Sequence, residues 1–173
     1  LVKAGSGLVT FGTSSSAGVP EAFANETIVL PLNDFDALKS CFEALSDEIA
    51  CVIIEPIPAN NGLLLQDLSF LTALRALCTE YGILLIFDEV ITGFGRTGAC
   101  TAAERFGVVP DIMTTAKGIT NATIPMGGVF VSDTIFERFM DTDVPGVELS
   151  HGYTYSGHPV ACAAGMATLD IYE

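Results

Sequence analysis

The stretch Ile83-Leu84-Leu85-Ile86-Phe87-Asp88 decides the fold of this chain, because it is an apolar run that ends on a carboxylate. The run shows no alternation of polar and apolar residues, which is typical of a strand covered on both faces, as in parallel sheets. It follows a segment with helical spacing, Asp67–Tyr81, and Gly82 is expected to end that helix. A helix that leads into a buried strand is the repeating unit of an α/β sheet.

The same alternation continues along the chain. Strands are predicted at 27–30, 50–54, 112–115 and 128–131, and helices at 34–45, 101–106, 134–140 and 159–172. Strands that alternate with helices predict an α/β fold with a three-layer, mostly parallel sheet. Ligands of such sheets bind outside the carboxyl ends of the strands. We therefore expect a site at the edge where Glu55, Asp88 and Lys117 each follow a strand.

Composition narrows the function classes. The chain has 173 residues, of which 50% are hydrophobic and 16% charged, so it can bury a core. A formal net charge of −14 argues against binding to nucleic acids or to anionic membranes. Five cysteines without a CxxC pair indicate reduced thiols and a cytoplasmic location, and two histidines are too few to predict a metal site. No apolar run has the length of a membrane span.

Lys117 is the one of the three lysines that is placed for chemistry, since it follows an apolar strand and precedes Gly118. A partly buried amine at this position can form a Schiff base, and the glycine leaves room for a ring to approach. Asp88 can hold a cationic group, such as a protonated pyridine nitrogen, through a charge-assisted hydrogen bond. A solvent-exposed lysine and an aspartate that caps a turn are the alternatives, and spacing alone leaves both open.

Two further patterns bear on the chemistry. Asp88-Glu89 after an aliphatic strand also matches a Walker B strand, which would make the chain an ATPase, but the required P-loop GxxxxGK[ST] does not precede it. The segment 153–156 (YTYS) places hydroxyl groups just before a helix N-terminus, where free N–H groups favour a phosphate. Capping of that helix by Ser156 is the alternative for this segment.

With these residues in place, the chain resembles the class III (ω-) aminotransferases, which are fold-type I pyridoxal-phosphate enzymes. The segments 84–98 (LLIFDEVITGFGRTG) and 110–118 (PDIMTTAKG) carry the resemblance, which covers essentially the whole chain. It implies that residues 1–173 are part of the large cofactor-binding domain and that residues 1–20 are an active-site lid loop. It also implies that a small C-terminal domain follows Glu173 and that this segment is inactive alone.

The resemblance implies roles for single residues. Lys117 is similar to the lysine that forms a Schiff base with pyridoxal phosphate and then moves the substrate proton. Asp88 is similar to the partner of the pyridine nitrogen, and Val90 to the residue that packs on the ring face. Thr154 matches the threonine that reaches the cofactor phosphate of the neighbouring subunit. A homodimer with shared active sites follows from that match.

Two branches of the family compete. The segment 1–7 (LVKAGSG), which contains Ser6, and the segment 55–62 (EPIPANNG) resemble glutamate-1-semialdehyde 2,1-aminomutase. Ser6, Glu55 and Asn60 are the candidate lid or substrate residues, and many ω-aminotransferases have a glutamate in place of Asn60. The later segments 95–98 (GRTG), 124–128 (IPMGG) and 151–159 (HGYTYSGHP) resemble β-alanine:pyruvate aminotransferases. Aminomutases usually carry three glycines where this chain has 121–123 (NAT).

The sequence therefore predicts an enzyme that transfers an amino group from an amine or ω-amino acid donor to a 2-oxo acid acceptor, with pyridoxal phosphate as cofactor. An aminomutase, which returns the amine to the neighbouring carbon of the same molecule, is the alternative, because the difference depends on lid closure and pocket shape. A catalytically inactive binding module is the alternative of another class. The presence of both Asp88 and Lys117 argues against that last interpretation.

Overall fold

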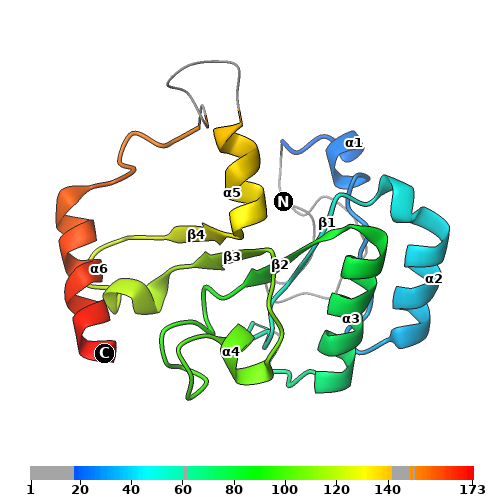
Figure 1. The fold of residues 1–173 in the computed structure, drawn as a ribbon, viewed down its shortest axis with the longest axis horizontal. Helices are drawn as coiled ribbons and strands as arrows, with labels where there is room; N and C mark the ends of the chain where they lie inside the picture. Colours follow the sequence, from blue (N-terminus) through cyan, green and yellow to red (C-terminus); the bar gives the residue numbers. More distant parts are fainter. Residues whose placement is uncertain (1–17, 61, 142–148, 150) are drawn as a thin grey trace. The chain divides into compact units, whose positions relative to one another are not determined.

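The computed structural model describes residues 18–60, 62–141, 149 and 151–173 (Figure 1). The chain divides into two compact units, of which the first ends at Ile83 and the second begins at Leu84. In the described part of the chain, no helix combines the length and the apolar character needed to cross a membrane.

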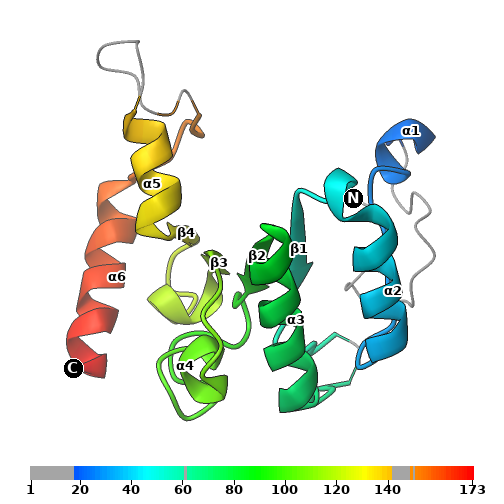
Figure 2. The ribbon, with the colours of Figure 1, turned by 45° about the vertical axis from the view of Figure 1, so that its right-hand side comes forward.

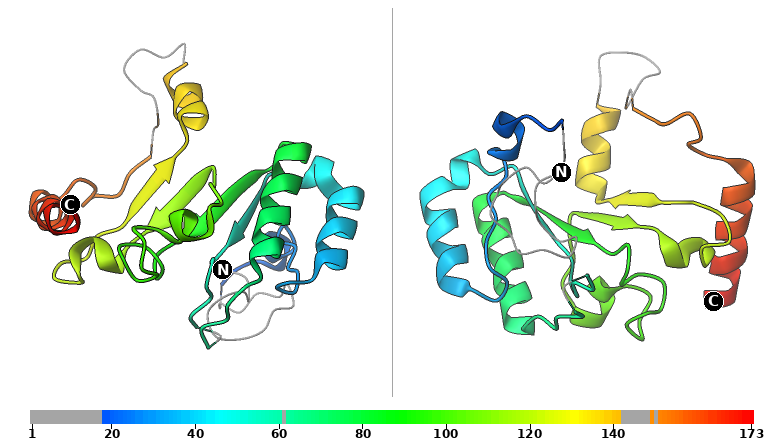
Figure 3. Two further views of the ribbon diagram at one scale, coloured as in Figure 1. Left: turned by 60° about the horizontal axis from the view of Figure 1, so that its bottom comes forward. Right: turned by 180° about the vertical axis from the view of Figure 1, so that it is seen from behind.

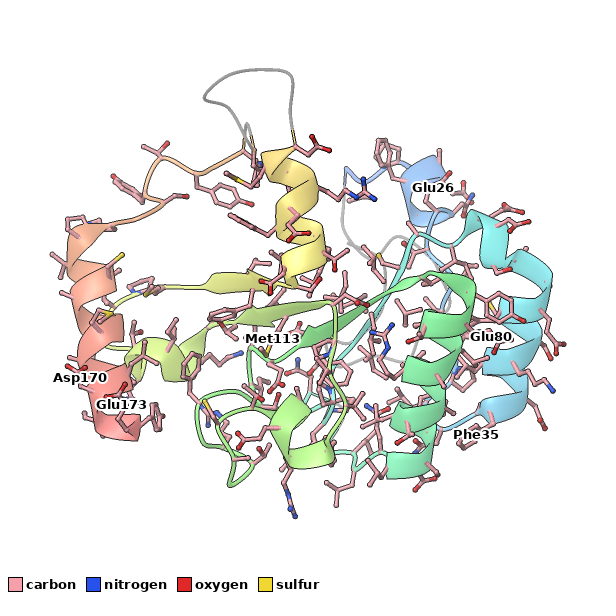
Figure 4. All side chains as sticks on the ribbon, viewed as in Figure 1. Glu26, Phe35, Glu80, Met113, Asp170 and Glu173 are labelled. Atoms are coloured by element: carbon pink, nitrogen blue, oxygen red, sulfur yellow. The ribbon has the colours of Figure 1, made fainter. Side chains whose placement is uncertain are left out.

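The helices α2 and α3 of the first unit pack side by side, as Figure 2 shows. Its described elements are α1 (Glu21–Ala24), α2 (Phe35–Leu45), the 3₁₀-helix η1 (Ser46–Glu48), β1 (Cys51–Ile54) and α3 (Leu68–Tyr81). Edge-to-face ring pairs join α2 to α3, with centroid distances of 5.4 Å for Phe35–Phe70 and 5.7 Å for Phe42–Tyr81. Phe35, labelled in Figure 4, lies at the start of α2. Buried aromatic and leucine side chains therefore hold this unit together.

Local chemistry explains where these two helices begin and end. The Asp34 carboxylate accepts a hydrogen bond of 2.9 Å from the backbone N–H of Ala37 and so caps α2. Gly82 ends α3 in the left-handed conformation, with φ of 70°, which glycine adopts without steric cost. The capping residue Asp34 and the terminal Gly82 were both identified in the sequence, and the predicted helices α2 and α3 are confirmed.

The second unit holds three consecutive strands of a four-stranded mixed sheet, drawn in green to yellow in Figure 3. Strand β2 (Leu84–Asp88) pairs parallel with β3 (Ile112–Thr115), and β3 pairs antiparallel with β4 (Gly128–Val131). Met113, labelled in Figure 4, is the β3 residue that lies between Phe87 and Phe130 in the register. The helices of this unit are α4 (Ala102–Phe106), the 3₁₀-helix η2 (Lys117–Thr120), α5 (Asp133–Met140) and α6 (Pro159–Tyr172).

Asp111 fixes the register of the sheet in the second unit. Its carboxylate accepts a hydrogen bond of 2.7 Å from the N–H of Leu85, and its own N–H donates to the Leu85 carbonyl at 2.8 Å. The carbonyl of Asp111 also accepts a hydrogen bond from the N–H of Ser132 at 2.9 Å, just beyond β4. One residue before β3 thus holds the start of β2 and the end of β4, so the strands cannot slip against each other.

Most of the predicted elements are confirmed to within one residue at each end, but residues 27–30 form no strand. Ile28 in this segment is 49% exposed, and the N–H of Thr27 completes a turn by donating to the Ala24 carbonyl at 3.2 Å. A short apolar run becomes a strand only where a neighbouring strand completes its hydrogen bonds. Composition alone does not supply that neighbour. Strand β4 is the antiparallel exception to the mostly parallel sheet that was expected.

Candidate functional site

Asp88 and Lys117 lie at the same edge of the sheet in the second unit. Asp88 is the last residue of β2, and in the parallel register it lies opposite Thr114 of β3. The next residue, Glu89, continues the pairing, because its N–H donates to the Thr114 carbonyl at 2.9 Å. Lys117 follows β3 at the same end, three residues beyond Thr114. The two predicted site residues thus come from the carboxyl ends of adjacent parallel strands, which is where α/β sheets bind ligands.

The Asp88 carboxylate is half-buried and has one oxygen available for a ligand. Its Oδ1 accepts a hydrogen bond of 3.0 Å from the N–H of Val90, so the aspartate does cap the turn after β2. Its Oδ2 accepts no hydrogen bond from the residues that the structure describes. A half-buried carboxylate oxygen of this kind is suited to a cationic N–H donor. Val90 is also half-buried, and its backbone orients the carboxylate.

Lys117 starts η2 with an uncommon backbone conformation. Its φ of 47° is in the left-handed region, which costs a residue with a side chain about 1–2 kcal/mol. The Lys117 carbonyl accepts a hydrogen bond from the N–H of Ala122 at 3.1 Å, and this contact helps to hold the strained turn. Strained backbone is concentrated at functional sites, where the surrounding structure holds it in place. The Lys117 side chain is exposed, however, so the expected partial burial is not found in this segment.

Gly118 is required by a close protein contact rather than by room for a ligand ring. A Cβ atom added at Gly118 would lie 2.8 Å from Cβ of Phe94 and 3.3 Å from the Gly93 carbonyl oxygen. A contact of 2.8 Å is shorter than a real Cβ makes, so a side chain at position 118 would displace its neighbours. The expectation that this glycine leaves space for a ring was therefore wrong, because Phe94 occupies that space.

Glu89 is a fully buried carboxylate directly after the site aspartate, with 0% of its surface exposed. Its Oε2 accepts hydrogen bonds from Thr92 Oγ1 at 2.9 Å and from the N–H of Ala102 at 2.6 Å. Its Oε1 accepts a hydrogen bond from the N–H of Ala103 at 2.8 Å. Both oxygens are thus occupied in tying the end of β2 to the start of α4. The Walker B interpretation fails here, since a carboxylate in this position cannot activate water.

Thr154 lies in an exposed turn before α6. Ser156 shapes that turn, since its Oγ accepts a hydrogen bond from the N–H of Tyr153 at 2.9 Å. The residue that caps α6 is His158, without a side-chain hydrogen bond, so capping of the helix by Ser156 is wrong. A groove of about 570 Å³ lies next to the turn. Its lining consists of Ile124, Pro125, Met126, Gly127, Tyr153, Tyr155, Ser156, Gly157, His158, Ala161 and Cys162.

The remaining candidate residues belong to the first unit. Glu55 directly follows β1 and is half-buried, and its carbonyl accepts a hydrogen bond from Gln66 Nε2 at 2.6 Å. Gln66 is itself buried and also donates to the Pro56 carbonyl at 3.2 Å, so it fixes the chain after β1. Asn60 is exposed, and Ser6 lies outside the described residues. A role for Glu55, Asn60 or Ser6 beside Asp88 and Lys117 stays a prediction.

The turn after η2 contains residues 121–123 (NAT), where aminomutases were expected to carry three glycines. Asn121 and Ala122 both have left-handed backbone, with φ of 49° and 59°. Hydroxyl groups fix this turn, because Thr120 Oγ1 donates to the Ile124 carbonyl and Thr123 Oγ1 to the Thr120 carbonyl, both at 2.7 Å. Glycine adopts such φ values freely, so glycines would fit these positions without strain. Here the loop keeps that shape without them.

Comparison with known proteins shows the family of this chain. The family model described as aminotransferase class-III matches residues 5–173. The chain belongs to the class III aminotransferases. It is 48% identical over 162 residues to an omega-aminotransferase of Caulobacter vibrioides, covering 94% of this chain and 35% of that protein. It is 53% identical over 128 residues to a beta-alanine–pyruvate aminotransferase of Pseudomonas aeruginosa, covering 73% and 29%.

Relatives from the aminomutase branch match as well. A glutamate-1-semialdehyde 2,1-aminomutase of Syntrophobacter fumaroxidans is 46% identical over 171 residues, covering 99% of this chain and 38% of that protein. The chain thus spans about a third of the length of the curated relatives that it matches.

Solved aminotransferase structures share the fold. An (S)-enantioselective omega-transaminase from Thermomicrobium roseum superposes with a TM-score of 0.74 at 47% identity, covering 79% of this chain and 30% of that one. A taurine:2-oxoglutarate aminotransferase from Bifidobacterium kashiwanohense, solved with pyridoxal phosphate and glutamate, gives a TM-score of 0.72 at 44% identity, covering 79% and 30%. The fold-type I assignment is therefore confirmed.

Replacing Glu89 with Gln is expected to destabilise this class III aminotransferase by about 2 kcal/mol, because an amide N–H₂ then faces backbone N–H groups that lose their acceptor. The matched control is Glu104→Gln. Glu104 also accepts a backbone hydrogen bond, from Cys100 at 2.9 Å, but it is exposed. Denaturant unfolding measures both. Equal and small effects would contradict the structural role of Glu89.

Replacing Ala122 with Gly is expected to stabilise the protein by about 1 kcal/mol, because glycine removes the cost of left-handed backbone and loses only part of that gain to a more flexible unfolded chain. Ala116→Gly is the control, since Ala116 is extended with φ of −161°. The control variant should be destabilised. A lower unfolding midpoint for Ala122→Gly than for the control would show that the turn is not strained.

Proposed function

We propose that the protein containing this segment transfers an amino group from an amine or ω-amino acid to a 2-oxo acid, with pyridoxal phosphate as cofactor. The observation that carries the proposal is the placement of Asp88 and Lys117 at the carboxyl ends of adjacent parallel strands. A carboxylate and an amine at one sheet edge match the two ends of this cofactor, a basic ring nitrogen and an aldehyde. Membership of the class III aminotransferases supports the same assignment.

The residues present fit the cofactor at both ends. The Oδ2 atom of Asp88 accepts no hydrogen bond from described residues, so it is available to the protonated ring nitrogen. The Lys117 side chain is exposed rather than held in an ion pair by the described residues, so its Nζ is free to react with the aldehyde. Bound pyridoxal phosphate supplies an electron sink that stabilises negative charge on the substrate carbon.

Each protein group then has one task. Asp88 keeps the ring nitrogen protonated, and the hydrogen bond from Val90 keeps the carboxylate pointed toward it. Val90, two residues after Asp88, would pack against the face of the ring. Lys117 Nζ would act as the base that takes the proton from the substrate carbon and as the acid that delivers it, in a 1,3-shift, to the former aldehyde carbon of the cofactor. Glu89, fixed by three hydrogen bonds, keeps the turn that carries Asp88 from shifting.

Intramolecular amino transfer is the second candidate, because relatives named glutamate-1-semialdehyde 2,1-aminomutase match nearly the whole chain. The same residues would perform the same first step in an aminomutase. Incubation of the intact protein with β-alanine and pyruvate separates the two, since formation of alanine requires an external acceptor. Turnover of glutamate-1-semialdehyde without any alanine formation would favour the aminomutase.

The whole assembly is also a proposal. We infer a homodimer in which Thr154 reaches the cofactor phosphate in the other subunit, and the exposed turn at Thr154 supports this. Helix α5 has no buried residue and exposes Phe136 and Phe139 by 54% and 41%, which indicates that further protein covers it. We also propose that residues 1–173 are part of a large domain, with residues 1–20 as a lid, and that this segment needs the small domain for activity.

A cytoplasmic location is proposed from the cysteines. All five are free thiols in the structure. Cys78 is buried, and burial raises the pKa of the Cys41 thiol, which favours its neutral form. Free thiols of this number are typical of a reducing compartment. Localisation of a tagged full-length protein tests this, and recovery outside the cytoplasm would contradict it.

Replacement of Lys117 with Ala is expected to remove covalent attachment of the cofactor and essentially all amino transfer. The intact protein is incubated with pyridoxal phosphate, reduced with borohydride and digested, and the modified peptide is mapped by mass spectrometry. Lys39→Ala is the matched control, because Lys39 is an exposed lysine paired with Glu43 at 3.7 Å. The adduct should lie on Lys117 in the control and vanish in Lys117→Ala. An adduct that persists in Lys117→Ala would remove the proposed catalytic lysine.

A further inference from the structure

We propose that Tyr172 and Phe94 are positioning residues that hold Lys117 in its working conformation, and that neither touches the cofactor. The proposal rests on the proposed function, because it concerns the lysine assigned there. The two aromatic residues and Gly118 are called the brace below. They come from three places in the second unit: the loop after β2, the 3₁₀-helix η2 and the end of α6.

Phe94 is held by hydrogen bonds at both its backbone N–H and its carbonyl. Its φ of 58° is left-handed, which is uncommon for an aromatic residue and needs support from the surrounding structure. The N–H of Phe94 donates to the Cys100 carbonyl at 2.7 Å within its own loop. Its carbonyl accepts a hydrogen bond of 2.8 Å from the Tyr172 hydroxyl, from a residue 78 positions further along the chain. The hydrogen bond from Tyr172 therefore ties this loop to α6, in addition to the contacts that the loop makes with Glu89 and Cys100.

Tyr172 reaches Phe94 from the last turn of α6. That turn lies between Asp170 and Glu173, which are labelled at the end of the helix in Figure 4. The two rings are in contact, with centroids 6.1 Å apart and planes tilted by 35°. A Cβ atom added at Gly95 would lie 3.3 Å from the Tyr172 ring, so the ring packs closely on the loop. The tyrosine thus contributes both packing and a directed hydrogen bond.

Phe94 in turn lies against Gly118, the residue after Lys117. The site of an added Cβ at Gly118 lies 2.8 Å from Phe94 Cβ and 3.5 Å from Phe94 Cγ. Gly118 is buried, and Lys117 immediately before it has the strained φ of 47°. Helix α6 also packs against η2 where Gly165 faces Met126 Sδ and the Ile119 carbonyl, which would lie 3.3 Å and 3.8 Å from an added Cβ. A shift of Phe94 is therefore passed directly to the backbone of the lysine.

The functional consequence follows from the precision that the chemistry needs. Lys117 Nζ must meet a carbon fixed by the cofactor ring, and a small displacement of a reacting group costs a large part of the rate. A lysine in ordinary backbone would hold its position without help. A lysine in left-handed backbone is held by its contacts. Besides the hydrogen bond from Ala122 and the threonine hydroxyls within the turn itself, the contact through Gly118 and Phe94 links this turn to Tyr172.

The first test is Tyr172→Phe in the intact, cofactor-loaded protein, which keeps the ring and removes the hydroxyl. The matched control is Tyr81→Phe, because Tyr81 also ends a helix and packs edge-to-face on a phenylalanine, Phe42. With β-alanine and pyruvate as substrates, kcat of Tyr172→Phe should fall about tenfold while KM changes less than about twofold. The pH midpoint of the absorbance of the Lys117-bound cofactor should shift, because the geometry at Nζ changes. The control should match the wild type in both.

The second test is a double-mutant cycle between Phe94 and Gly118. Gly118→Ala should lower kcat about a hundredfold, because the new Cβ meets Phe94 and displaces Lys117. Phe94→Gly removes that obstacle and allows the left-handed φ freely. The double variant should therefore recover at least about tenfold over Gly118→Ala alone. Additive losses would overturn the brace.

The outcomes separate this proposal from the proposed function. Wild-type protein that shows no cofactor absorbance and no adduct on Lys117 would overturn both. Wild-type protein with the adduct, and a Tyr172→Phe variant with unchanged kcat and absorbance midpoint, would overturn the brace alone. A Tyr172→Phe variant with a lower melting temperature but an unchanged absorbance midpoint and unchanged kcat for the folded fraction would also overturn it, since stability would be the only role of the hydroxyl.

Discussion

The parallel pairing of β2 with β3 is the constraint on which the candidate site depends. Parallel strands end at the same edge, so the register that places Asp88 opposite Thr114 also brings Lys117 to the edge that carries Asp88. Asp111 fixes this register through hydrogen bonds to Leu85 and Ser132. A one-residue slip would turn every side chain of β2 to the other face of the sheet and separate the carboxylate from the amine.

Around this edge several residues have strained, left-handed backbone, which contacts with neighbouring residues stabilise. Phe94, Lys117, Asn121 and Ala122 all have left-handed backbone, and they lie in the two loops that leave β2 and β3. The buried carboxylate of Glu89 anchors the first loop, and threonine hydroxyls anchor the second. Such an arrangement places reactive groups accurately at a cost in local stability. The cost is offset by the rigid sheet and by the packing of α6 on η2.

Much of the fold was predictable from the sequence, because each correct element had a local cause. Asp34 and Gly82 mark helix ends through capping and left-handed backbone, and the unbroken apolar run before Asp88 marks a strand. Coverage of both faces is not found in the described residues, where Leu85 and Phe87 are buried but Leu84 is exposed. The false strand at 27–30 and the antiparallel direction of β4 depend on which segments meet in space. Local composition does not contain that information.

In the site, too, features with a local cause could be predicted, and contacts between distant segments could not. Asp88 and Lys117 could be found from their positions after apolar strands, and the resemblance to class III aminotransferases assigned them roles. Glu89 was considered only within the Walker B alternative, which the missing P-loop already argued against. A carboxylate directly after a buried strand is also a signal for a buried anchor. The contact of Phe94 with Gly118 joins residues from different loops, so no spacing rule reveals it.

The crystal structure of the intact protein with pyridoxal phosphate tests the account most directly. We predict continuous density from Lys117 Nζ to the cofactor, the ring nitrogen within hydrogen-bond distance of the free Asp88 oxygen, and Thr154 of a second subunit at the phosphate. A cofactor held by another lysine, or a ring nitrogen that faces away from Asp88, would contradict it.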